Sequence, residues 1–77
     1  MRQPIPKAFG QMLRQYREQK GWSQLKLAEK AELSLNAIGM FERGERSPSL
    51  DTVFKLCRVL GVPPGEMITE VARELAR

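Results

Sequence analysis

The chain has 77 residues and a formal net charge of +4. This length indicates one small domain, and because such a domain is only marginally stable by itself, self-association is expected to matter. A single cysteine and the absence of histidine exclude an intrachain disulfide, and they predict neither a metal site nor another cofactor. No apolar run has membrane-spanning length and no signal peptide is recognisable, so we expect a cytoplasmic, nucleoid-associated protein.

The positive charge lies in the first part of the chain. Residues 1–46 hold nine lysines and arginines against five glutamates, whereas residues 47–77 hold four basic and four acidic residues. A polyanion such as nucleic acid is a natural partner for the first part. A merely solvated basic surface is the alternative reading of the same numbers.

The first predicted elements are an arm and a helix. Pro4 and Pro6 predict a flexible N-terminal arm over residues 1–7, because proline lacks a backbone donor. Apolar residues at spacings of three, four and seven then predict a helix over residues 8–19, and Gly21 ends it.

Two short helices follow, joined by a very short turn. Ser23 and Ser34 are favourable N-caps for them. The second ends near Arg43, because Gly44 suits the left-handed position after a helix. Small residues on either side of the turn allow the two helices to cross closely. The pattern over about residues 23–43 is therefore typical of a helix-turn-helix.

The remainder predicts two more helices. Ser49 caps the fourth and Gly61 ends it, and a pair of prolines opens a fifth helix over about residues 64–77. With no strand pattern, residues 8–77 are predicted to form one all-α domain of five helices. The broad apolar face of the fourth helix consists of Leu50, Val53, Phe54, Leu56, Cys57 and Leu60.

The stretch SQLKLAEKAELSLNAIGMFERGERSPSLDTVFKLCRVLGV resembles the lambda-repressor-like, Cro-type (xenobiotic-response-element) helix-turn-helix family of bacterial and phage regulators. The resemblance covers about residues 9–68 and implies a compact five-helix lambda-repressor-like domain that binds DNA. Small controller proteins of restriction–modification systems and compact phage or plasmid repressors are the most similar kinds of member. The matching residues are Ser23-Gln24, Leu27-Ala28, Ser34, Ile38, Glu42-Arg43-Gly44, Pro48-Ser49-Leu50 and Leu60-Gly61-Val62.

The resemblance further implies an ion pair between Arg17 and Glu42. A bidentate pair of this kind can fix the angle between two helices, although two surface charges that never meet are the alternative. The resemblance also implies that Gln24, at the start of the second helix, bonds the DNA backbone and braces the recognition helix.

Base reading is expected from the outer face of the third helix, because Ile38 and Phe41 are its inward residues. Asn36 can contact adenine through two hydrogen bonds, and the apolar residues can contact thymine methyl groups. Gly39 either lets the helix approach DNA more closely or is simply tolerated. The candidate base-reading residues are Ser34, Leu35, Asn36, Gly39, Met40 and Arg43.

Phosphate contacts supply affinity without sequence information. Each basic candidate is alternatively an ordinary solvated side chain. The candidates are Gln24, Arg14, Lys20, Lys26, Arg43 and Arg46.

The fifth helix has an apolar stripe that needs a partner. We expect a dimer contact about a two-fold axis, although closure of the monomer's own core is the alternative. The stripe consists of Met67, Ile68, Val71, Ala72 and Leu75.

These observations together predict a sequence-specific, dimeric DNA-binding transcription regulator that inserts its third helix into the major groove of a palindromic operator. The expected partners are double-stranded DNA and a second copy of the chain (a homodimer), with RNA polymerase as a further candidate. No membrane, small-molecule ligand, sensing domain or enzymatic activity is expected. The alternative is an antitoxin-like or other protein-interaction module that uses the apolar face of the third or fifth helix.

Overall fold

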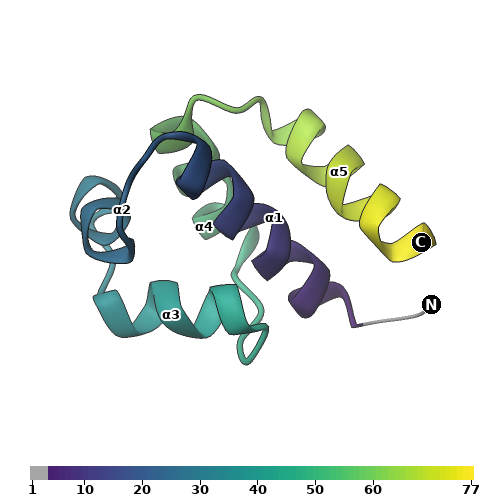
Figure 1. Cartoon of the computed structure of the whole chain (residues 1–77), viewed down its shortest axis with the longest axis horizontal. Coiled ribbons are helices and arrows are strands. Elements are labelled where there is room, and N and C mark those ends of the chain that lie inside the picture. Colours follow the sequence, from purple (N-terminus) through teal and green to yellow (C-terminus); the bar gives the residue numbers. More distant parts are fainter. Residues whose placement is uncertain (1–3) are drawn as a thin grey trace.

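The computed structural model describes residues 4–77, and over that range the chain forms five helices and no strand (Figure 1). The all-α prediction is therefore confirmed. None of these helices combines the length and the apolar character needed to cross a membrane. The helices are α1 (Ile5–Gln19), α2 (Gln24–Ala31), α3 (Leu35–Arg43), α4 (Leu50–Leu60) and α5 (Pro64–Ala76).

The start of α1 corrects the predicted arm. The helix begins at Ile5 rather than at residue 8, with Pro4 at the N-cap and Pro6 in the first turn. Proline is tolerated there because the first N–H groups of a helix have no intrahelical acceptor. Residues 5–7 are thus helical, and residues 1–3 of the predicted arm lie outside the described residues.

The predicted helix ends are present. Each of Ser23, Ser34 and Ser49 accepts, through its hydroxyl oxygen, a hydrogen bond from the backbone N–H three residues later, at 3.0–3.1 Å. Each such cap stabilises the domain by about 1 kcal/mol. Gly44 and Gly61 end α3 and α4 in the left-handed region, with φ of 73° and 72°. These local signals therefore fix the length of the recognition helix.

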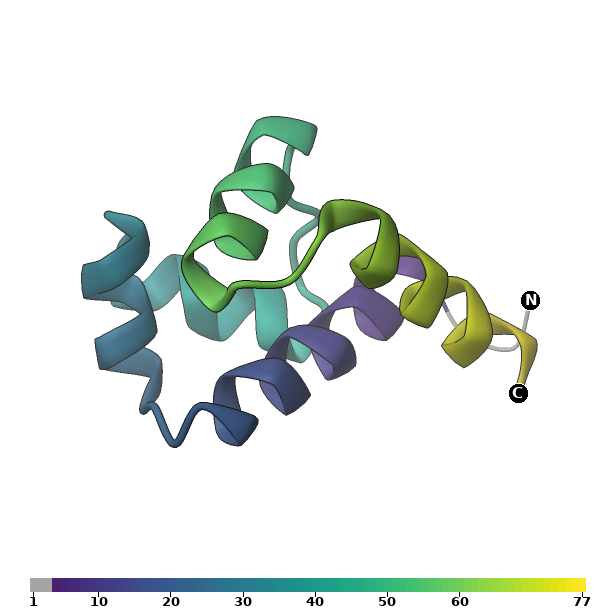
Figure 2. The same ribbon diagram turned by 90° about the horizontal axis from the view of Figure 1, so that it is seen from above.

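One hydrophobic core is shared by all five helices. α1 lies in the middle and packs against α3 on one side and α5 on the other (Figures 1 and 2). α2 and α5 lie at opposite ends of the molecule in both views. The largest fully buried side chains come from every helix and are Leu13, Leu27, Ile38, Leu56, Cys57, Leu60 and Met67.

Two glycines allow the end of α3 to lie directly against α1. A Cβ atom at Gly10 would lie 2.3 Å from the carbonyl oxygen of Phe41 and 2.6 Å from that of Glu42. A Cβ atom at Gly44 would lie 2.7 Å from the Cα of Lys7. The backbones of α1 and α3 are thus in contact with no room for a side chain between them. This contact sets the direction in which α3 leaves the core.

The apolar face of α4 is narrower than predicted. Val53 and Leu56 are buried, but the side chains of Leu50 and Phe54 are 69% and 50% exposed. All of these residues belong to the predicted apolar face, but the other helices leave Leu50 and Phe54 half-exposed or more. Cys57 is buried as predicted, and this burial raises the pKa of its thiol.

Helix α5 corrects the predicted dimer stripe. Met67 and Val71 are buried in the monomer's own core, and Leu75 packs against it while partly exposed. Ile68 and Ala72 remain exposed. The two buried residues are therefore not available to a second copy, because α5 closes the core over α1 and α4.

Candidate nucleic-acid interface

Helices α2 and α3 form the helix-turn-helix. Glu32 ends α2 in the left-handed region with φ of 56°, and the Leu33 N–H then donates to the Ala28 carbonyl at 2.9 Å. Ala28 and Ala31 are buried at the crossing, so that the two helices approach closely. Figure 1 shows α3 running along one edge of the molecule, with one side turned away from the other helices.

The two sides of α3 differ as predicted. Ile38 is fully buried and Phe41 nearly so, whereas Leu35 is 49% exposed and Asn36 is exposed. Because a helix repeats every 3.6 residues, the outer side carries two rows of residues four apart. One row is Leu35, Gly39 and Arg43, and the other is Asn36 and Met40.

Gly39 does not present a bare backbone on this outer side. It is buried, and a Cβ atom at this position would lie 2.9 Å from the Nη1 atom of Arg43. The Arg43 side chain thus reaches back one turn and covers Gly39. That Gly39 lets the helix approach DNA more closely, or is simply tolerated, stays a prediction.

Within the second row, the Asn36 Nδ2 donates to the Met40 sulfur at 3.5 Å. A thioether is a weak acceptor, so this contact holds the amide only loosely. Ser34, which is also exposed, uses its hydroxyl oxygen as the N-cap of α3.

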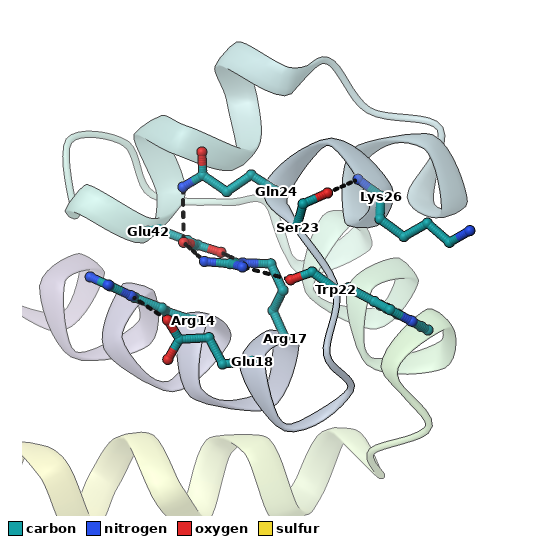
Figure 3. Close-up of polar contacts among 8 residues, drawn as sticks. All are labelled: Arg14, Arg17, Glu18, Trp22, Ser23, Gln24, Lys26 and Glu42. Atoms are coloured by element: carbon teal, nitrogen blue, oxygen red, sulfur yellow. Dashed lines mark hydrogen bonds and ion pairs between the residues drawn. The ribbon is translucent and has the colours of Figure 1, made fainter.

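A buried polar network holds α3 to α1 and α2 (Figure 3). The Arg17 Nε and Nη2 atoms donate to the two carboxylate oxygens of Glu42 at 2.6 and 3.0 Å, and Arg17 Nη1 donates to the Trp22 carbonyl at 2.7 Å. The hydrogen bond to Glu42 raises the pKa of Arg17. The structure thus brings together the two residues for which an ion pair was predicted.

Gln24 completes this network. Its Nε2 atom donates to the same Glu42 carboxylate at 3.0 Å, which links the start of α2 to the end of α3. The side chains of Arg17 and Glu42 are only 11% and 4% exposed, and no buried side-chain polar atom among residues 4–77 lacks a partner. Gln24 is therefore placed to brace the recognition helix.

The predicted phosphate contacts fall into two groups. Arg14 and Arg43 are exposed but already pair with Glu18 and Glu45, at 3.0 and 2.8 Å. Exposed pairs of this type are weak and exchange readily for a phosphate. Lys26 and Arg46 are also exposed, near the starts of α2 and α4.

Lys20 is not brought to the α3 face. Its Nζ atom lies 5.8 Å from the centre of the Trp22 ring and 3.7 Å from the position of a Cβ atom at Gly61. Figure 1 shows this end of α1 beside the end of α4, with α3 along the opposite side of the molecule. Lys30, which the sequence analysis did not single out, lies 4.9 Å from the same ring.

A separate apolar surface surrounds a hollow of about 120 Å³ between the start of α1, the segment before α4, and α5. We call it the apolar hollow. Ile5 and Ile68, both 52% exposed, are among its lining residues. The sequence analysis missed it, because its parts come from three distant segments. The lining residues are Ile5, Pro6, Phe9, Ser47, Pro48, Val53, Ile68 and Val71.

Comparison with known proteins assigns the class. Residues 13–67 match the model of the helix-turn-helix family, and the chain therefore belongs to that family. It is 43% identical over 51 residues to the HTH-type transcriptional regulator SutR of Escherichia coli, covering 66% of this chain and 29% of SutR. The chain thus spans under a third of that relative, and the two share the helix-turn-helix part.

Two similar controller proteins are closer in length. The chain is 43% identical over 61 residues to the control protein C.BamHI of Bacillus amyloliquefaciens, covering 78% of this chain and 75% of that protein. Its structure is similar to the crystal structure of the restriction-modification controller protein C.AhdI from Aeromonas hydrophila, with a TM-score of 0.78 and 40% identity, covering 80% of this chain and 94% of that one. These relatives are regulators and controller proteins, in agreement with the class indicated by the sequence.

Proposed function

We propose that the chain is a sequence-specific, dimeric DNA-binding transcription regulator that places α3 in the major groove of a palindromic operator. The observation that carries this proposal is the outer side of α3, where Leu35, Asn36 and Arg43 are exposed. Arg17 and Gln24 brace this helix from behind through hydrogen bonds to its residue Glu42. A major groove accepts one α-helix, and the second helix of a helix-turn-helix is the one that enters it. The family assignment supports the same conclusion.

Asn36 is the polar reading residue in this proposal. Its Nδ2 can donate to N7 of adenine while its Oδ1 accepts from the N6 amino group, which makes one bidentate contact. The long contact to the Met40 sulfur gives way easily to such a base. Leu35, half exposed in the other row, can contact a thymine methyl group.

We assign phosphate binding to the starts of α2 and α3 and to exposed basic side chains on α1, on α2 and after α3. The first N–H groups of a helix and its positive dipole end attract phosphate. Lys26 in the first turn of α2, Arg14 on α1 and Arg46 after α3 add positive charge. These contacts position the protein on the duplex without reading sequence.

The dimer contact is assigned to the apolar hollow and its rim instead of to the whole stripe of α5. Ile5 and Ile68 line the hollow, and Leu50 and Phe54 expose more apolar area on α4. Exposed apolar residues from separate elements mark interaction surfaces when they form one patch. A two-fold contact between two such surfaces presents two copies of α3 to the same duplex.

Similarity to C.BamHI and C.AhdI supports a more specific role, that of a controller of a restriction–modification system. In this proposal the concentration of the chain regulates transcription, because dimer formation and DNA binding both depend on it. A protein-interaction module is the competing function, favoured by the same apolar hollow.

The test is binding to duplex DNA over a range of salt concentrations. We expect affinity to fall steeply with salt, because phosphate contacts release counterions. Arg46→Ala should reduce the slope of log affinity against log salt by about one and weaken all sequences alike. Asn36→Ala should leave the slope unchanged and cost about 1–3 kcal/mol on the best site only. Binding that is insensitive to salt would contradict the proposal and favour an apolar protein partner.

A further inference from the structure

Three residues at the end of α3 form one unit. Arg43 donates to Glu45 through two atoms, Nε to Oε2 at 2.8 Å and Nη2 to Oε1 at 3.2 Å. The third nitrogen, Nη1, lies over Gly39, 2.9 Å from the position that a Cβ atom would occupy there. The guanidinium is thus held by a carboxylate on one edge and rests on a residue without a side chain.

This arrangement leaves a defined edge of the guanidinium unoccupied by Glu45. An arginine has five N–H donors in a fixed planar fork, and Glu45 takes the edge formed by Nε and Nη2. The end edge, formed by Nη1 and the second N–H of Nη2, keeps two parallel donors. Two parallel donors of this spacing match the O6 and N7 acceptors of guanine in the major groove.

We propose that Gly39, Arg43 and Glu45 together read a guanine, with Arg43 as the contacting residue and Gly39 and Glu45 as positioning residues. This inference rests on the proposed function, because it assigns a base to the same α3 face. Glu45 occupies the side edge of the guanidinium and so leaves its end edge for a base, and Gly39 leaves the space in which the group lies. The role of Glu45 is therefore orientation, since its negative charge opposes DNA binding in general.

The Arg43–Glu45 pair can be removed by mutation without disturbing the fold. Both side chains are more than half exposed, so the ion pair contributes little to folding. The hydrogen bond from Arg43 lowers the pKa of Glu45, so that both groups stay charged near neutral pH. Removing Glu45 therefore leaves the fold intact, and any loss of base preference is assignable to Arg43.

The experiment starts from the best site that the wild-type chain selects from random duplexes. The guanine that Arg43 contacts is identified with Arg43→Ala. Replacing this guanine lowers the affinity of the wild-type chain but not that of the variant. At that base pair, Glu45→Ala should lose about ten-fold of the preference for guanine, within the range of one bidentate contact. Its affinity for unrelated DNA should be equal or higher. Glu45→Gln keeps one acceptor oxygen and should retain an intermediate preference.

Gly39→Ala is the second, independent variant. Its methyl group displaces the end of a flexible side chain and not backbone, so the domain should fold and melt at an equal or higher temperature, since alanine is the better helix former. It should lose guanine preference at the same base pair as Glu45→Ala. Glu70→Ala is the control, because it removes the same charge and breaks an Arg–Glu pair on α5, and it should leave the preference unchanged.

Two results would overturn the inference alone. One is full guanine preference in Glu45→Ala and Gly39→Ala. The other is an equal loss of affinity by these variants on all sequences. If the wild-type chain selected no site at all, the proposed function would fail, and the inference would fail with it.

Discussion

Glu42 accepts hydrogen bonds from side chains of two other helices, Arg17 on α1 and Gln24 on α2. Arg17 and Gln24 thus hold α3 through its own residue Glu42, and the Arg17–Glu42 ion pair is almost fully buried. The ion pair adds little to the free energy of unfolding compared with a pair of apolar residues of similar volume. Removal of one partner, however, leaves the other charge buried without compensation. We therefore propose that Glu42 affects DNA binding through the position of α3.

At this residue scale we predict that Glu42→Ala lowers the free energy of unfolding by about 3–5 kcal/mol, because Arg17 keeps its charge in a buried place. Urea denaturation followed by circular dichroism measures the change. Glu18→Ala is the matched control, since it breaks an exposed ion pair with Arg14 and should cost less than about 1 kcal/mol. Equal losses in the two variants would show that the network does not hold α3.

At the scale of elements, the contact between α1 and the end of α3 leaves no room for a side chain. Gly10 is the residue that permits it, because the carbonyl oxygens of Phe41 and Glu42 occupy the space of a side chain. A glycine inside a helix costs about 1 kcal/mol relative to alanine, so its presence there needs a packing reason. Here the reason is the approach of two backbones.

Gly10→Ala should therefore destabilise the domain by about 1–3 kcal/mol or more, as overpacking of a core does, despite the better helix propensity of alanine. Differential scanning calorimetry would record a lower melting temperature. Gly65→Ala in α5 is the control: a Cβ atom there meets nothing within 4 Å, so we expect no loss and a small gain. A Gly10→Ala protein as stable as the wild type would refute the close approach.

The starts and ends of the helices are the features that the sequence predicts best. Ser23, Ser34 and Gly44 are local signals, since a cap or a left-handed residue acts within one turn of the chain, and the helices begin and end at them. The exposure of Leu50 and Phe54 was not predictable in the same way. Periodicity locates an apolar face, but only the packing of other helices decides how much of it is covered.

The candidate site also has a part that the sequence predicts and a part that it does not. The inward positions of Ile38 and Phe41 follow from helical spacing, and the structure has them buried. The position of the Arg43 side chain over Gly39 depends on Glu45, which belongs to the following loop, and pattern analysis did not connect the three. Contacts between a helix and the loop that follows it leave no periodic pattern in the sequence. They are therefore recognised only in the three-dimensional structure.

At the scale of the whole molecule, α5 closes the core and leaves Ile68 beside the apolar hollow. We predict that Ile68→Glu converts the dimer to a monomer in sedimentation analysis, because it places a charge in the proposed contact. Leu25→Glu is the matched control, since Leu25 is equally exposed (52%) but lies on α2 at the other end of the molecule. Dissociation by both variants, or by neither, would remove the apolar hollow from the dimer contact.

In the proposed function, two copies of α3 read one symmetric stretch of DNA. Selection of binding sites from random duplexes by the purified wild-type chain is the decisive measurement. We expect enrichment of a two-fold symmetric site whose half-sites are about one helical turn apart, roughly 34–36 Å between centres. Enrichment of no sequence, or of a single half-site without a symmetric partner, would contradict it.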